Sequence, residues 1–118
     1  MKNLANSHLP LAPASLHILL ALSGEEMHGY GIMQEVLRQS ESRYRLGPGT
    51  LYDNLQRLVT QELVEEMAAR RGEEDSRRRY YGLSGLGRAV LRAEVDRLEL
   101  VVLEARQRLA MRQPRRAR

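Results

Sequence analysis

The sequence contains no cysteine, tryptophan or phenylalanine, and its only lysine is Lys2. Without cysteine, the chain has no disulfide, no thiolate nucleophile and no cysteine-ligated zinc site. Without the two bulkiest apolar aromatic side chains, its core must be built mainly from Leu, Val, Met and Ala. Because the chain has only 118 residues, this aliphatic core is also small. We therefore expect a single domain whose core is helped by a partner chain.

Long apolar runs are also missing. No stretch approaches the ~20 apolar residues that a transmembrane helix needs. The segment from Met1 to Ser7 is polar, unlike the charged and then apolar start of a secretory signal. The sequence therefore predicts a cytoplasmic protein that does not cross a membrane.

Motifs typical of enzymes are absent as well. The three histidines, His8, His17 and His28, are scattered, and no HExxH or similar spacing supports a metal site. The glycines between Gly82 and Gly87 are in the wrong order for a dinucleotide fingerprint, and no GxxxxGKS or GxxxxGKT phosphate loop occurs. We expect no catalytic activity, no metal and no cofactor.

The charge of the chain suits an anionic partner. Lysine and arginine number 19 against 15 aspartates and glutamates, which gives a formal net charge of +4. All of the basic residues except Lys2 are arginines, whose planar guanidinium binds phosphate through two hydrogen bonds. A genome rich in G and C also favours arginine codons, so codon usage is an equal explanation of the arginine excess.

Apolar residues recur at helical spacing in three segments before residue 61. The first begins near Pro13, the second follows His28-Gly29 and the third begins at Pro48. Proline is favoured as the first residue of a helix because its missing N–H has no partner there. Residues 1–12 resemble a loose arm.

The third helix has two different faces. Its inner face carries Leu51, Leu55, Leu58 and Val59. Its outer face is short, polar and mostly uncharged, and it consists of Gly49, Thr50, Asp53, Gln56 and Arg57.

A β-hairpin is predicted next, with strands over about 63–68 and 79–83. Alternation along the second strand places one ring of Tyr80-Tyr81 inward and the other toward solvent or a partner. Five arginines flank the acidic turn of the hairpin, namely Arg70, Arg71, Arg77, Arg78 and Arg79. As a wing, the hairpin would bind phosphates through these arginines. The alternative is a solvated hairpin whose charges neutralise one another.

Ser84 is a plausible N-cap for a last helix that extends to about Met111. Apolar residues follow one another along it at spacings of four and three, which is typical of a coiled-coil seam. These residues are Leu91, Val95, Leu98, Val102, Ala105 and Leu109. Because a helix of ~28 residues extends roughly 42 Å, we expect the seam to pair with a second copy of the chain.

These elements predict a fold that is mainly α with a small β-hairpin: a winged helix-turn-helix followed by a long C-terminal dimerisation helix. The expected divisions are an arm at 1–12, the DNA-binding domain at 13–83, the dimerisation helix at 84–111 and a basic tail at 112–118. In such domains the third helix enters the major groove of DNA. Thr50, Gln56 and Arg57 are therefore candidates for base contacts. Asp53 either accepts a hydrogen bond from a cytosine amino group or stabilises the helix N-terminus.

Three motifs resemble the PadR family of transcription regulators. They are HGY at 28–30, GTLYDNLQRL at 49–58, and RYYGL at 79–83 followed by Gly87. The family pattern runs HGYxI, GTLYxxLxRLxxxGL and YYxLTxxG, in this order and spacing. The chain differs at Asp53, where the family often has proline, at Gln61-Glu62-Leu63, which lacks the usual glycine, and at Ser84, which replaces threonine.

The resemblance implies a homodimeric repressor on a palindromic operator in double-stranded DNA, released in some members by a small-molecule effector. It places Gly49, Thr50 and Tyr52 at the DNA-facing start of the recognition helix, and Tyr30 near the phosphates. Tyr30 and Tyr52 also flank apolar stripes, so a packing role is the alternative for both.

The main alternative function is a protein–protein adaptor that uses a winged helix without specific DNA binding. The third helix has a formal charge of about zero, because Asp53 offsets Arg57. Binding of DNA would then rest on other segments, and salt would weaken it steeply. A sensor of an apolar ligand is a further alternative, although no set of residues identifies a ligand.

Overall fold

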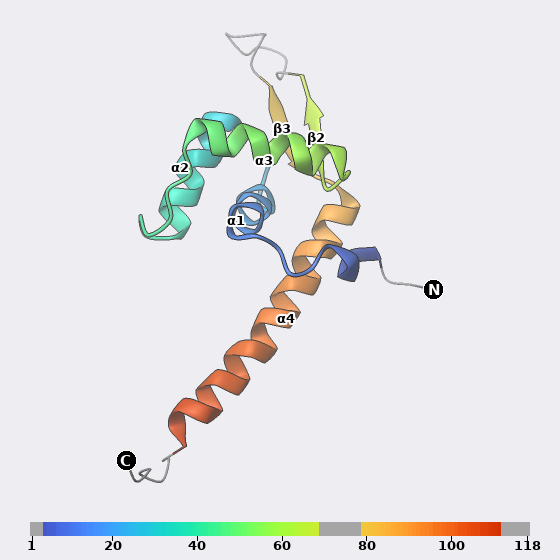
Figure 1. The fold of residues 1–118 in the computed structure, drawn as a ribbon. Coiled ribbons are helices and arrows are strands. Elements are labelled where there is room, and N and C mark those ends of the chain that lie inside the picture. Colours follow the sequence, from blue (N-terminus) through green and yellow to red (C-terminus); the bar gives the residue numbers. More distant parts are fainter. Residues whose placement is uncertain (1–3, 69–78, 112–118) are drawn as a thin grey trace.

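The computed structural model describes residues 4–68 and 79–111 of the chain. It is mainly helical and holds one small antiparallel sheet (Figure 1). In chain order the elements are η1 (Leu4–His8, a 3-10 helix), α1 (Pro13–Leu22), β1 (Met27–His28), α2 (Gly29–Gln39), α3 (Pro48–Thr60), β2 (Val64–Met67), β3 (Tyr80–Leu83) and α4 (Gly85–Ala110). The predicted fold class is confirmed, as are the three helix starts at residues 13, 29 and 48.

The core lies between the first three helices, with α1 seen end-on below α3 in Figure 1. Aliphatic side chains from all three helices are almost fully buried there. They are Ile18 and Leu19 of α1, Ile32 and Val36 of α2, and Leu51, Leu55 and Leu58 of α3. The predicted inner face of α3 is thus confirmed, with Val59 partly buried at its margin. Burial of each such side chain contributes about 1.5–3 kcal/mol, which fixes α3 across the top of the domain.

A tight turn connects α3 to the sheet. The N–H of Leu63 donates to the carbonyl of Leu58 at 3.0 Å, and the N–H of Glu62 donates to the carbonyl of Val59 at 2.9 Å. This pairing is a Schellman motif, which needs a left-handed residue after the helix. Glu62 supplies it with a φ of 65°. The chain therefore reverses within three residues and enters β2 directly.

The sheet has three strands in the order β1-β3-β2, so it extends the predicted hairpin by one strand. Met27 pairs with Tyr81 and His28 pairs with Tyr80. The prediction that one of the two tyrosine rings faces outward is wrong, because both are buried. Tyr81 belongs to the core. Tyr80 packs edge-on against the His28 ring, with the ring centroids 5.5 Å apart.

Ser84 joins α4 to the end of α3. Its Oγ accepts from the Gly87 N–H at 2.9 Å, which confirms the predicted N-cap. The same Oγ donates to the carbonyl of Glu62 at 2.7 Å, and the Ser84 N–H donates to the carbonyl of Leu63 at 3.0 Å. The first turn of the long helix is therefore bonded to the turn that follows α3.

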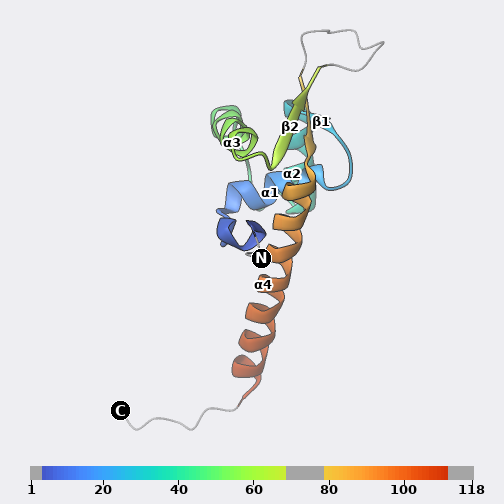
Figure 2. The same ribbon diagram turned by 90° about the vertical axis from the view of Figure 1, so that its right-hand side faces the viewer.

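The expectation of a loose arm is wrong for residues 4–12, which pack against α4 (Figure 2). Ala5 of η1 is buried in the core. The Leu11 N–H donates to Oε2 of Glu94 at 3.1 Å, and Glu94 pairs with Arg97 at 2.7 Å. Glu94 is only 1% exposed, and the sequence analysis missed it because its partner lies 83 residues away.

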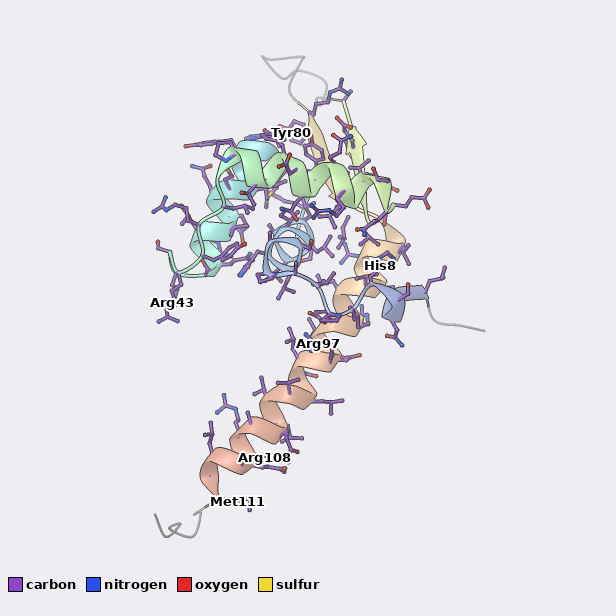
Figure 3. All side chains as sticks on the ribbon, viewed as in Figure 1. His8, Arg43, Tyr80, Arg97, Arg108 and Met111 are labelled. Atoms are coloured by element: carbon purple, nitrogen blue, oxygen red, sulfur yellow. The ribbon has the colours of Figure 1, made fainter. Side chains whose placement is uncertain are left out.

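Beyond Arg97, α4 projects away from the rest of the molecule (Figure 3). Every residue from 99 to 111 is exposed, including several large apolar side chains. None of the helices in the described ranges is apolar enough over a sufficient length to cross a membrane.

Candidate nucleic-acid interface

The outer face of α3 is exposed as the sequence predicts. Gly47 is its N-cap and Pro48 its first residue, so the helix begins without a side-chain cap. The exposed residues are Gly49, Thr50, Tyr52, Asp53, Gln56 and Arg57. The position of Gly49 is open, since a Cβ there would meet no atom within 4 Å. The start of α3 thus presents its backbone and short side chains to an approaching molecule.

The start of α2 lies against α3 through Gly29 and Tyr52. The Tyr52 hydroxyl occupies the place that a Cβ on Gly29 would take, so only glycine permits this approach. His28 caps α2, because its Nδ1 accepts from the Gly31 N–H at 3.1 Å. The next residue after Gly29, Tyr30, is 61% exposed. The HGY motif therefore builds a helix junction and leaves Tyr30 exposed at the start of α2.

Arg57 is held by a neighbour on its own helix. Its Nη1 donates to Oδ1 of Asn54 at 2.9 Å. Asn54 is buried, and the Nδ2 of its side chain donates to the carbonyl of Thr50 at 2.8 Å. Sequence analysis did not identify Asn54, although its position three residues before Arg57 is a spacing at which helix side chains meet.

Gln56 and Tyr52 border a cleft of about 120 Å³ between α3 and the sheet. Glu66 and Tyr81 line its other side. Burial, helped by the nearby Glu66 carboxylate, raises the pKa of the Tyr81 hydroxyl. Glu66 in turn pairs with Arg79 at 3.4 Å. This ion pair joins β2 to the residue that precedes β3.

Of the five predicted wing arginines, Arg79 pairs with Glu66, and the other four lie outside the described residues. Arg70, Arg71, Arg77 and Arg78 belong to the segment between Ala68 and Arg79. The described strands β2 and β3 lead into that segment from the α3 side of the molecule (Figure 1). The phosphate-binding role of these arginines stays a prediction.

Asp53 lies on the exposed face, five residues after Pro48. The first turn of α3 contains no acidic residue. Because the helix dipole acts mainly within the first turn, Asp53 contributes little to the helix N-terminus, and its contact with a base stays a prediction.

A groove next to β1 and α2 is lined by several acidic side chains. It has a volume of about 500 Å³ and is lined partly by Glu25, Glu26 and Glu35. Arg38 pairs with Glu35 at 2.6 Å and lowers the pKa of that carboxyl through the hydrogen bond. Arg38 offsets one of the three carboxylates, and the remaining excess of negative charge disfavours phosphate in this groove. Within the described ranges, no group of three or more His, Asp or Glu side chains is arranged to hold a metal ion.

The sequence between residues 18 and 93 matches the family described as the transcriptional regulator PadR-like family. A transcriptional regulator of Mycobacterium tuberculosis, Rv3488, is 36% identical over 93 residues, which cover 79% of this chain and 82% of that protein. An uncharacterized 37.1 kDa protein in a Streptomyces fradiae transposon is 37% identical over 81 residues. This match covers 69% of the chain but only 21% of the transposon protein.

Solved structures share the fold. A PadR family regulator from Clostridium difficile superimposes with a TM-score of 0.72 at 22% identity, over 84% of this chain and all of that one. Bacillus subtilis PadR, solved in complex with operator DNA, superimposes with a TM-score of 0.60 at 17% identity, over 92% of this chain and 53% of that one.

Proposed function

The chain belongs to the PadR-like family of transcriptional regulators, and we propose that it acts as a homodimeric repressor on a palindromic operator. The family supplies the general function, which is DNA-binding regulation of transcription. The dimer, the repressor role and the individual contacts are our proposal.

The exposed face of α3 is the proposed reading surface. Thr50, Gln56 and Arg57 would contact base edges in the major groove, where each base pair shows a different pattern of donors and acceptors. Gly49 lets the helix backbone come close to DNA, and Tyr30 and Tyr52 border the phosphates. The wing arginines would add contacts that are independent of base sequence.

The exposure of apolar side chains on the second half of α4 is the observation that supports a dimer. Beyond the domain, large apolar side chains are open to water: Val95, Leu100, Val101, Val102, Leu103 and Leu109, the last at 85%. Each Leu or Val left in water forgoes about 1.5–3 kcal/mol of burial. Pairing with α4 of a second copy would cover this surface in an isologous dimer.

The N-terminal end of the predicted seam is not available to a partner. Leu91 is buried in the core of its own chain, so the surface available to a partner begins at Val95. Leu98, Val102, Ala105 and Leu109 continue it along the helix. The twofold axis of such a dimer relates two α3 helices, which would bind half-sites about 34 Å apart.

Repression follows from occupancy, because a dimer that covers two major grooves blocks other proteins from the same DNA. Release would require a molecule that binds better to a dimer with a different angle between the subunits. The family resemblance suggests a small-molecule effector for this role.

The test is a selection of bound duplexes from a randomised pool by the purified protein, followed by salt-titrated gel shifts. We expect a palindrome, and we expect Gln56→Ala and Arg57→Ala to weaken the selected duplex more than random duplex by about 1–3 kcal/mol. Thr60→Ala, on the same helix, is the matched control and should change neither. Failure to enrich any sequence would support the adaptor function instead.

A further inference from the structure

Asn54 is the only polar residue of α3 that is buried, with 8% of its surface exposed. Its neighbours along the inner face are Leu51, Leu55 and Leu58. An asparagine in such a place costs free energy unless its amide is fully hydrogen-bonded. The hydrogen bonds of this amide therefore decide what the residue does beside an aliphatic face.

The amide has one orientation that satisfies both of its ends. The Thr50 carbonyl can only accept, so the Nδ2 of Asn54, 2.8 Å away, must be the atom that faces it. The Oδ1 then points to Arg57, whose guanidinium can only donate, at 2.9 Å. Thr50, Asn54 and Arg57 thus form a chain of hydrogen bonds along one flank of the helix.

Arg57 keeps most of its donors after this bond. A guanidinium has five N–H groups in a fixed plane, and Asn54 occupies one of them. Arg57 is otherwise exposed beside the outer face of α3. A long side chain that is already held in place loses less entropy when it binds, so its remaining donors meet a partner at lower cost.

We propose that Asn54 is a positioning residue that sets the orientation of Arg57 for reading a base in the operator. The inference rests on the proposed function, because it requires Arg57 to contact DNA. Asn54 itself is buried beneath the reading surface and acts only through Arg57.

Two substitutions of Asn54 separate positioning from folding. Asn54→Leu has a similar size and suits the apolar flank, but it accepts no hydrogen bond. Asn54→Asp retains an acceptor for Arg57 but loses the bond that Nδ2 donates to the Thr50 carbonyl, so it should lower stability while Arg57 stays held. The measured quantity is the ratio of affinities for the duplex selected by the wild-type protein and for random duplex. We expect Asn54→Leu to lower this ratio about fivefold to tenfold, and Asn54→Asp to keep it within about twofold, with thermal unfolding confirming that both variants fold.

A double-mutant cycle with Arg57→Ala identifies the route of the effect. If Asn54 acts through Arg57, Asn54→Leu lowers the ratio in the wild-type background and has no further effect beside Arg57→Ala. Equal effects in both backgrounds would overturn the positioning role while leaving Arg57 as a reading residue. An unchanged ratio for Arg57→Ala alone would instead overturn the proposed reading surface, and this inference with it.

Discussion

A Cβ atom on Gly87 would collide with the backbone carbonyl oxygen of Leu63. The first turn of α4 therefore rests directly on the turn that ends α3, and Ser84 bonds to the same turn from the side. This contact connects α4, the proposed dimerisation helix, with α3, the proposed recognition helix.

Gly87→Ala should destabilise the protein, because the new methyl group meets backbone that cannot move away. We expect a loss of about 1–3 kcal/mol in the free energy of unfolding, measured by urea denaturation. Gly85→Ala is the matched control, since a Cβ at Gly85 meets nothing within 4 Å. A Gly87→Ala protein as stable as the control would contradict the close contact.

Glu62→Gly should stabilise the protein. Glu62 adopts a φ of 65°, a left-handed conformation that costs a residue with a Cβ about 1–2 kcal/mol. Glycine loses more entropy on folding, so we expect a net gain near ~1 kcal/mol in chemical denaturation. Gln61→Gly, one residue earlier at a φ of −79°, should instead lower stability. Position 62 is also where the family pattern usually has its glycine.

The Glu94 carboxylate should make stability depend on pH. The hydrogen bond from Arg97 lowers the pKa of Glu94, and the Leu11 N–H adds to this. Because the folded state then binds the proton more weakly than the unfolded state, the stabilisation is present above the unfolded pKa of about 4.3. It disappears as the pH falls through the lower folded pKa.

Glu94→Gln therefore tests this group. We expect a loss of about 1 kcal/mol at pH 7, a modest value because Arg97 is 39% exposed. The difference from wild type should narrow below about pH 4. Glu99→Gln, on an exposed part of the same helix, should show no such difference at either pH. Equal losses for Glu94→Gln at pH 3.5 and pH 7 would argue against an ionised Glu94.

Leu98→Asp should convert the dimer into a monomer, because it places a charge in the middle of the exposed seam. Sedimentation of the wild-type protein at micromolar concentration should show a dimer, and the variant should also lose tight binding to the selected duplex. Leu98→Ile, which keeps the seam apolar at the same position, is the matched control and should leave the dimer intact. A monomeric wild-type protein would remove the basis of the proposed assembly.

The elements with strong local signals could be predicted from the sequence. Pro13 and Pro48 mark helix starts, and the spacing of Leu51, Leu55 and Leu58 defines the inner face of α3 because helical periodicity is a local property. Ser84 was identified as a cap for the same reason. The outer face of α3 followed directly from the inner one.

The features that sequence analysis missed depend on distant partners. The strand β1 has only two residues, too few for a pattern, and exists because Met27 and His28 pair with β3. That pairing also buries Tyr80, whereas alternation alone predicts that one of the rings of Tyr80-Tyr81 faces outward. Glu94 resembles any helix surface carboxylate until residues 4–12 fold over it. Asn54 resembles an exposed polar residue until its flank of α3 is known to be buried.

Because α4 is long, a small change of angle at Ser84 and Gly87 moves its far end by a large distance. The helix spans 26 residues, so it extends about 39 Å from its first turn. A tilt of only about 5° at the joint would move its far end by roughly 3 Å, comparable to the rise of one base pair. In a dimer held together by α4, the same small tilt at the joint would also change the distance between the two α3 helices. Besides its proposed role in pairing the subunits, α4 would therefore amplify small changes of angle that arise where Ser84 and Gly87 contact the turn after α3.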